Sequence, residues 1–144
     1  MRKLIFAISA LALGSSIALA DPIKDREALM KANGAAMGGL SAFVKGEKPY
    51  DAAEVLALLS KLSEDAVKLD SPALWPAGSD ADSEASPKIW EDPAGFQAAL
   101  DKFKADTAAA VAAAPADIDA LKMQVGAIGQ NCASCHQAFR VKKG

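Results

Sequence analysis

The residues best suited to chemistry lie together near the end of the chain, at Cys132-Ala133-Ser134-Cys135-His136. Both cysteines and the only histidine of the 144-residue chain fall within these five positions. This Cys-x-x-Cys-His spacing is the attachment signature of c-type haem. On a helix the two thiols lie one turn apart, so each can take one vinyl group of the porphyrin while the adjacent imidazole reaches the iron. The motif predicts one covalently bound haem c, with Cys132 and Cys135 as thioether residues and His136 as the proximal iron ligand.

Three other interpretations of the motif explain fewer of its residues. A disulfide between the two cysteines would close a very short loop and leave the histidine without a role. A zinc site needs four ligands, and this window offers three with no second cluster elsewhere in the sequence. A thioredoxin-like redox pair needs a strand followed by a helix, which the pattern described below does not supply.

The first twenty residues have the features of a secretory signal peptide. Met1-Arg2-Lys3 gives a charged start, and an almost unbroken apolar run from Leu4 to Leu13 follows. That run is too short to span a bilayer. Ala18-Leu19-Ala20 supplies small residues at the positions that a signal peptidase inspects. We therefore expect residues 1–20 to be removed before Asp21, and the mature chain to be a periplasmic protein without a membrane anchor.

The remaining 124 residues, 21–144, are enough for one domain and too few for two. The whole chain has 16 basic and 18 acidic residues, and removal of Arg2 and Lys3 leaves a formal net charge of −4. Nucleic-acid binding requires a basic stripe, so this charge excludes nucleic acid as an expected partner.

Apolar residues recur at helical spacing in four segments, and no segment of the mature chain alternates as a half-buried strand would. A first helix is predicted from about Pro22 to Lys45, with Gly46 as its stop signal. A second begins after Asp51, which is a good N-cap, and Glu54 can reach back in a capping box.

The third and fourth helices are equally well marked. The third opens at Asp92-Pro93, an N-cap aspartate followed by proline at the first helical position. The fourth follows Pro115, and its apolar stripe includes both cysteines: Ile118, Leu121, Val125, Ile128, Cys132, Cys135 and Phe139. The prediction is an all-α protein, an antiparallel up-down four-helix bundle.

A long connection separates the second and third helices, from Asp70 to Glu91. It contains both tryptophans, three prolines and an acidic stretch at residues 80–84. A connection of this length in a compact domain is usually functional or disordered. We expect its two ends to pack on the bundle through the tryptophans while the acidic centre stays in water.

A haem motif at the end of a four-helix chain, instead of near its start, resembles the class II cytochromes c. These are cytochrome c-prime and its low-spin, methionine-ligated relatives. The matching stretches are Arg26 to Met30, Lys45 to Asp51, Pro87 to Trp90 and Cys132 to Arg140. They are spread over almost the whole chain after residue 20.

The resemblance implies a role for Met30, because the family faces its sixth iron site with the residue four positions after the arginine of the first helix. Five-coordinate members often have a non-ligating side chain there, whereas low-spin members bind iron through methionine sulfur. From the residues alone, Met30, Met37 and Met123 are all candidates, and a methionine at helical spacing is more often core than ligand. The resemblance favours Met30 as the sixth ligand.

Three further residues are candidates for the haem pocket. Arg26 lies one turn before Met30, so it either pairs with a haem propionate or remains a solvated first-turn residue. Arg140 matches a basic residue that lies beside the proximal haem face in the family, and it also complements the negative end of the last helix. Among the aromatic residues that could pack on the porphyrin, Trp90 ranks before Phe139 and Tyr50, although such residues are core by default.

The resemblance implies electron transfer between transient redox partners, and no enzymatic activity, because two protein ligands leave no open position on the iron. The alternative is a five-coordinate protein that binds nitric oxide or carbon monoxide. A third hypothesis is a haem-free helical interaction module. The sequence does not fix the oligomeric state, although family members with this architecture are often homodimers.

Overall fold

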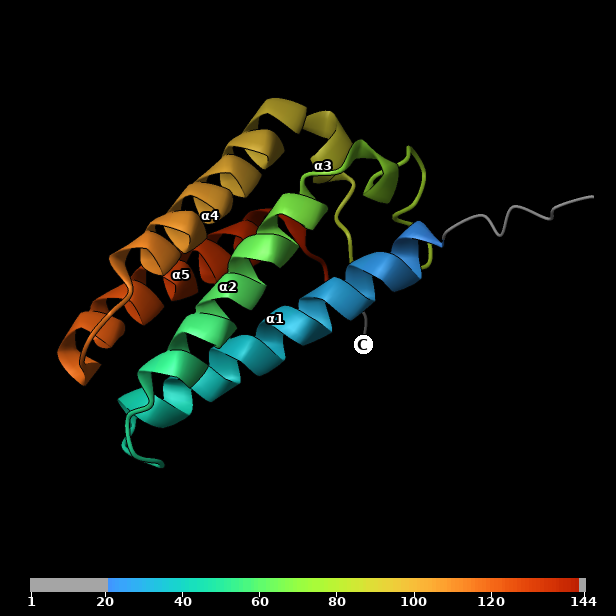
Figure 1. The fold of residues 1–144 in the computed structure, drawn as a ribbon. Coiled ribbons are helices and arrows are strands. Elements are labelled where there is room, and N and C mark those ends of the chain that lie inside the picture. Colours follow the sequence, from blue (N-terminus) through green and yellow to red (C-terminus); the bar gives the residue numbers. More distant parts are fainter. Residues whose placement is uncertain (1–20, 143–144) are drawn as a thin grey trace, which may run out of the picture.

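A computed structural model describes residues 21–142 of the chain. The predicted signal peptide, residues 1–20, lies outside the described residues. Four long helices form the body of the structure: α1 (Pro22–Val44), α2 (Ala52–Leu69), α4 (Pro93–Ala113) and α5 (Ile118–Phe139). Each packs on the next, and α5 also packs on α1, so the helices close into an up-down bundle (Figure 1). The all-α four-helix prediction is confirmed.

An aspartate caps the start of every long helix. The carboxylates of Asp21, Asp51, Asp92 and Asp117 each accept hydrogen bonds from backbone N–H groups of the first helical turn. The caps predicted at Asp51 and Asp92 are therefore confirmed. The capping box is not seen, because the carboxylate of Glu54 pairs with Lys48.

The long connection between α2 and α4 contains two short helices, η1 (Pro72–Leu74) and α3 (Lys88–Glu91). It lies at one end of the bundle, whereas the two short connections, residues 45–51 and 114–117, lie at the other end (Figure 1). We call these the site end and the far end. Within residues 21–142 the only β pairing is an isolated antiparallel bridge between Ala85 and Arg140.

The interior contains two apolar clusters. The far-end core draws on all four long helices: Ala36, Leu40, Phe43, Val55, Leu59, Leu62, Ala110, Leu121 and Ile128. The site-end core is richer in aromatic side chains: Leu69, Leu74, Ile89, Phe96, Leu100 and Phe139. Burial of each large apolar side chain contributes roughly 1.5–3 kcal/mol, so both clusters stabilise the bundle. No helix of the described part is both long and apolar enough to cross a membrane.

Candidate functional site

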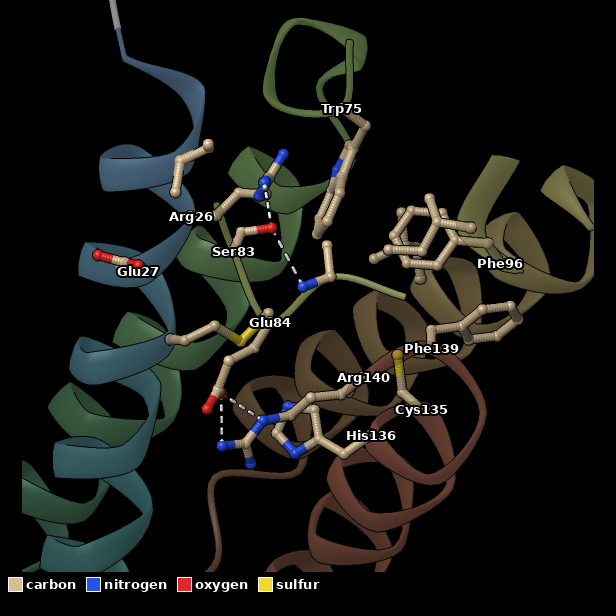
Figure 2. A pocket seen from close by; sticks show the side chains of 15 residues that line it. Arg26, Glu27, Trp75, Ser83, Glu84, Phe96, Cys135, His136, Phe139 and Arg140 are labelled. Atoms are coloured by element: carbon tan, nitrogen blue, oxygen red, sulfur yellow. Dashed lines mark hydrogen bonds and ion pairs between the residues drawn. The ribbon is translucent and has the colours of Figure 1, made fainter. Parts of the chain in front are cut away.

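A cavity of about 500 Å³ opens at the site end of the bundle. Side chains from α1, α3, α4, α5 and the long connection line it (Figure 2). Its apolar wall includes a chain of three aromatic rings, in which Trp75 meets Phe96 at 4.7 Å between centroids and Phe96 meets Phe139 at 5.2 Å. Both contacts are edge-to-face, a favourable arrangement for aromatic rings.

The Cys-x-x-Cys-His motif occupies the last turns of α5, as its sequence predicts. Cys132 packs against the far-end core, and Cys135 packs against the site-end core and lines the cavity. Both are free thiols, so the structure does not pair them in a disulfide. Burial raises the pKa of both thiols, with a further increase at Cys135 from the neighbouring Cys132.

His136 also lines the cavity, at its exposed rim. Partial burial lowers the pKa of the imidazole, and the positive charge of Arg140 lowers it further, while the negative charge of Glu84 opposes both. These effects favour the neutral imidazole, which is the form that binds metals.

Among the three candidate methionines, Met30 is the one that lines the cavity. It reaches the cavity from α1, and its side chain is 37% exposed. Met37 packs against the far-end core, and Met123 is 69% exposed on α5. The structure therefore brings a thioether from the first helix and an imidazole from the last helix to the same cavity.

Arg26 is buried, with only 5% of its surface exposed, and its guanidinium is bound to the long connection. One terminal nitrogen donates to the Leu74 carbonyl at 2.6 Å and to Ser79 Oγ at 2.8 Å. The other donates to the Ser79 carbonyl at 2.7 Å and to Ser83 Oγ at 3.2 Å. Each terminal nitrogen carries two hydrogens, so these four bonds use all of them.

The guanidinium also stacks over Trp75, with 4.9 Å to the ring centroid. Of the two roles considered for Arg26, burial rules out that of a solvated first-turn residue. Pairing with a haem propionate stays a prediction, and only the Nε–H lies outside the four bonds to the connection. The main contacts of Arg26 hold the connection that walls the cavity.

Residues 79–86 of the connection form a strap between α1 and the end of α5. Arg26 holds one side of the strap through Ser79 and Ser83. On the other side, the Ser86 N–H donates to the Phe139 carbonyl at 3.0 Å, and the Val141 N–H donates to the Glu84 carbonyl at 2.9 Å. As expected, the acidic residues Asp82 and Glu84 are exposed; Ser83 between them is buried.

An ion pair reinforces the second side of the strap. Nε and one terminal nitrogen of Arg140 contact Oε2 of Glu84, at 2.6 and 2.5 Å. Figure 2 shows this pair beside the imidazole of His136, and all three side chains line the cavity. Arg140 thus lines the cavity beside His136, where the family resemblance implies that it should lie.

The aromatic residues that line the cavity differ from those ranked first from the sequence. Trp90 is not among the residues that line the cavity, because its indole N–H donates to the carbonyl of Trp75 at 3.1 Å and its ring packs in the site-end core. Trp75 lines the cavity instead. Phe139 lines it as well, whereas Tyr50 lies at the far end and donates to the Pro115 carbonyl.

The chemistry of this donor set fits a haem. The thiol of Cys135, the imidazole of His136 and the thioether of Met30 line a cavity whose volume falls in the range of roughly 300–1,000 Å³ typical of cofactor pockets. Cys132 is not among the lining residues and lies one helical turn before Cys135 on α5. A zinc site fits less well, because residues 21–142 contain no group of three His, Cys, Asp or Glu side chains that could hold a metal.

Comparisons with known proteins agree with this chemistry. A family model described as Cytochrome C' matches residues 21–140. A cytochrome c' of Rhodopseudomonas palustris is 43% identical, over 91% of this chain and 90% of that protein. A cytochrome c-556 of Agrobacterium fabrum is 39% identical, over 86% of this chain and 84% of that protein. The solved structure of a cytochrome c' from Rhodopseudomonas palustris superimposes with a TM-score of 0.79 at 40% identity, over 87% of this chain and 99% of that chain.

Proposed function

This chain belongs to the cytochrome c' family of class II cytochromes c, and we propose that within it the chain is a periplasmic electron carrier whose iron is held by His136 and Met30. As a family member it binds one covalently attached haem c and serves electron transfer or gas binding. The axial ligands, the attachment residues and the choice between those two functions are our proposal.

Each donor has a separate role. The thiols of Cys132 and Cys135 would hold the haem through thioether bonds, each formed by addition of S–H across one vinyl group. His136 would bind the iron through its neutral imidazole, and Met30 would bind it through its thioether sulfur. When bound, the haem supplies a one-electron ferric–ferrous couple.

The observation that carries the proposal is the convergence of Met30 and His136 on one cavity from two different helices. With an imidazole and a thioether on the iron, no position would remain for a substrate, so a carrier is favoured over an enzyme. A thioether ligand favours ferrous iron, and the apolar walls at Ile89, Phe96 and Leu100 disfavour the additional charge of the ferric state.

The location and the partners are part of the proposal. The predicted leader, residues 1–20, and the covalent haem of the family support a periplasmic location for a mature protein of residues 21–144. Electron donors and acceptors would meet it transiently at the exposed rim of the cavity, where the charges of Glu27, Glu84 and Arg140 would steer their approach. Homodimer formation stays a prediction.

Absorption spectra of the mature haem-loaded protein test the proposed ligation. We expect the ferric protein to show the charge-transfer band of methionine ligation and the ferrous protein to bind carbon monoxide poorly. Met30→Leu should abolish that band and make carbon monoxide bind readily. Met37→Leu and Met123→Leu are matched controls, and both should keep the spectrum of the unsubstituted protein.

The second candidate function is capture of nitric oxide or carbon monoxide by five-coordinate iron. The 37% exposure of Met30 favours it, because a side chain so weakly packed can turn away from the cavity. A high-spin spectrum with ready carbon monoxide binding, unchanged by Met30→Leu, would establish this function and refute the carrier.

A further inference from the structure

We infer that Glu84 is a positioning residue that sets the reduction potential of the site, by neutralising Arg140 beside His136. The inference rests on the proposed coordination of haem iron by His136. It concerns a residue of the strap that neither binds the iron nor belongs to the Cys-x-x-Cys-His motif.

The geometry places a pair of opposite charges at the rim of the cavity. Glu84 and Arg140 both line it, as does His136. The backbone bridge between Ala85 and Arg140 fixes the two chain segments relative to each other, so the side chains meet without depending on each other for their position. The contacts of 2.6 and 2.5 Å to a single carboxylate oxygen complete the pair.

Both charges lie beside the imidazole of His136 at the rim of the cavity. Their fields would act in opposite directions on an iron bound to that imidazole, because a nearby positive charge disfavours the additional positive charge of the ferric state and a nearby negative charge favours it. An unpaired Arg140 would therefore raise the reduction potential, and Glu84 cancels much of that effect.

The side chains of the pair are 41% and 46% exposed, so water weakens their field without abolishing it. Because both side chains are partly exposed, either charge can be removed by substitution. Glu84→Gln keeps the length of the side chain and an oxygen that can accept from Arg140, and the backbone bonds at Ser86 and Val141 do not involve the carboxylate. The substitution thus removes the charge while the strap stays in place.

The test is redox titration of the haem-loaded variants at pH 7 and low ionic strength. Glu84→Gln should raise the reduction potential, and Arg140→Gln should lower it. Opposite signs distinguish an electrostatic role from a structural one, because both substitutions weaken the same ion pair and a loosened strap would shift the potential in the same direction. Glu84→Asp, which keeps the charge, should lie close to the unsubstituted protein.

The matched control is the ion pair of Lys48 and Glu54 at the far end. Glu54→Gln and Lys48→Gln change the net charge by the same amounts, and both should leave the potential almost unchanged. In 1 M salt, where the screening length is about 3 Å, the two site-end shifts should shrink.

Shifts of the same sign for Glu84→Gln and Arg140→Gln, or shifts no larger than those of the controls, would overturn the inference. If Glu84→Gln is not obtained with haem, Arg140→Gln decides the question, because a potential that does not fall in that variant also overturns it. The absorption spectrum with carbon monoxide reports separately on the sixth ligand, so failure of the proposed Met30 ligation remains distinguishable from failure of this inference.

Discussion

The far end of the bundle is closed by two short connections over an aliphatic core, whereas the site end is closed by one long connection over a cavity. At the far end, mainly aliphatic side chains from all four long helices fill the interior, and Tyr50 joins the two connections through the Pro115 carbonyl. At the site end, a few polar contacts of Arg26, Glu84 and Arg140 hold the strap in place. The far end thus depends on apolar burial, and the site end on directional bonds around an open space.

Among the substitutions that test this contrast, Arg26→Met should lower stability the most, because it removes polar contacts that hold the strap at the site end and leaves the far end unchanged. The substitution leaves the Leu74 carbonyl, which is among the acceptors of Arg26, without its donor. We expect the free energy of unfolding of the haem-loaded protein to fall by about 3 kcal/mol, the scale of losing bonds from a buried charged donor. Denaturant titration measures the loss, and hydrogen exchange should locate it in residues 74–86.

Lys48→Met is the matched control for this prediction. Lys48 stacks on Phe43 and pairs with Glu54 at the far end, in an exposed setting. Its loss should cost less than about 1 kcal/mol. Equal losses in the two variants, or faster exchange spread over the whole bundle after Arg26→Met, would contradict the distinction between the two ends.

Ala114→Gly, at the far end, should increase the stability of the protein, by less than Arg26→Met lowers it. Ala114 has φ of 40° and caps the end of α4 in the left-handed region, where a β-carbon is unfavourable. Glycine should relieve this strain, and its greater flexibility in the unfolded chain should offset part of the gain. The net result should be an increase of about 0.5–1 kcal/mol in the free energy of unfolding.

Thermal unfolding of the Ala114 variant should be compared with that of Ala113→Gly. Ala113 lies within the last turn of α4, where glycine is expected to cost about 0.5–1 kcal/mol. Glycine at these adjacent positions should thus move the melting temperature in opposite directions. A decrease at both positions would show that the Ala114 conformation is not strained.

Asp70→Asn should produce the smallest effect on stability, and that effect should disappear in acid. Asp70 ends α2 at the site end and accepts hydrogen bonds from Lys104 and from Gln97 of α4. The bond from Lys104, followed by that from Gln97, holds the pKa of Asp70 below its usual value of 3.8. Because the folded pKa is lowered, its contribution to stability is present above pH 3.8 and is lost as the pH falls through the folded pKa.

Denaturant titrations between pH 7 and pH 2 should therefore show the unsubstituted protein to be more stable than Asp70→Asn at neutral pH, with a difference that declines below about pH 4. In a Lys104→Met background the same substitution should have much less effect. A difference that stays constant across this range would mean that the carboxylate charge of Asp70 contributes nothing to the α2–α4 contact.

The helices could be predicted from the sequence because their signals are local. Asp51 and the Asp92-Pro93 pair mark helix starts within a few residues, and the stripe from Ile118 to Phe139 gives the inward face of α5. The Cys-x-x-Cys-His motif is also local, so three donors of the candidate site needed no knowledge of the fold. Met30 needed a family resemblance, since its position opposite His136 depends on how α1 packs on α5.

The strap could not be predicted, because its partners are distant in sequence. Arg26 binds residues 48 to 57 positions away, and two of its acceptors are backbone carbonyls, which carry no side-chain signal. Glu84 and Arg140 are 56 positions apart. The choice of Trp75 over Trp90 depends on the bend at η1, which nothing in the local pattern reveals.

The far-end core has a consequence for biogenesis. Its members come from all four long helices, and none of them lines the cavity. The polypeptide can therefore gather its helices around this core without the cofactor. Such an intermediate would present Cys132 and Cys135 one helical turn apart for the proposed haem attachment, and the strap end would close afterwards.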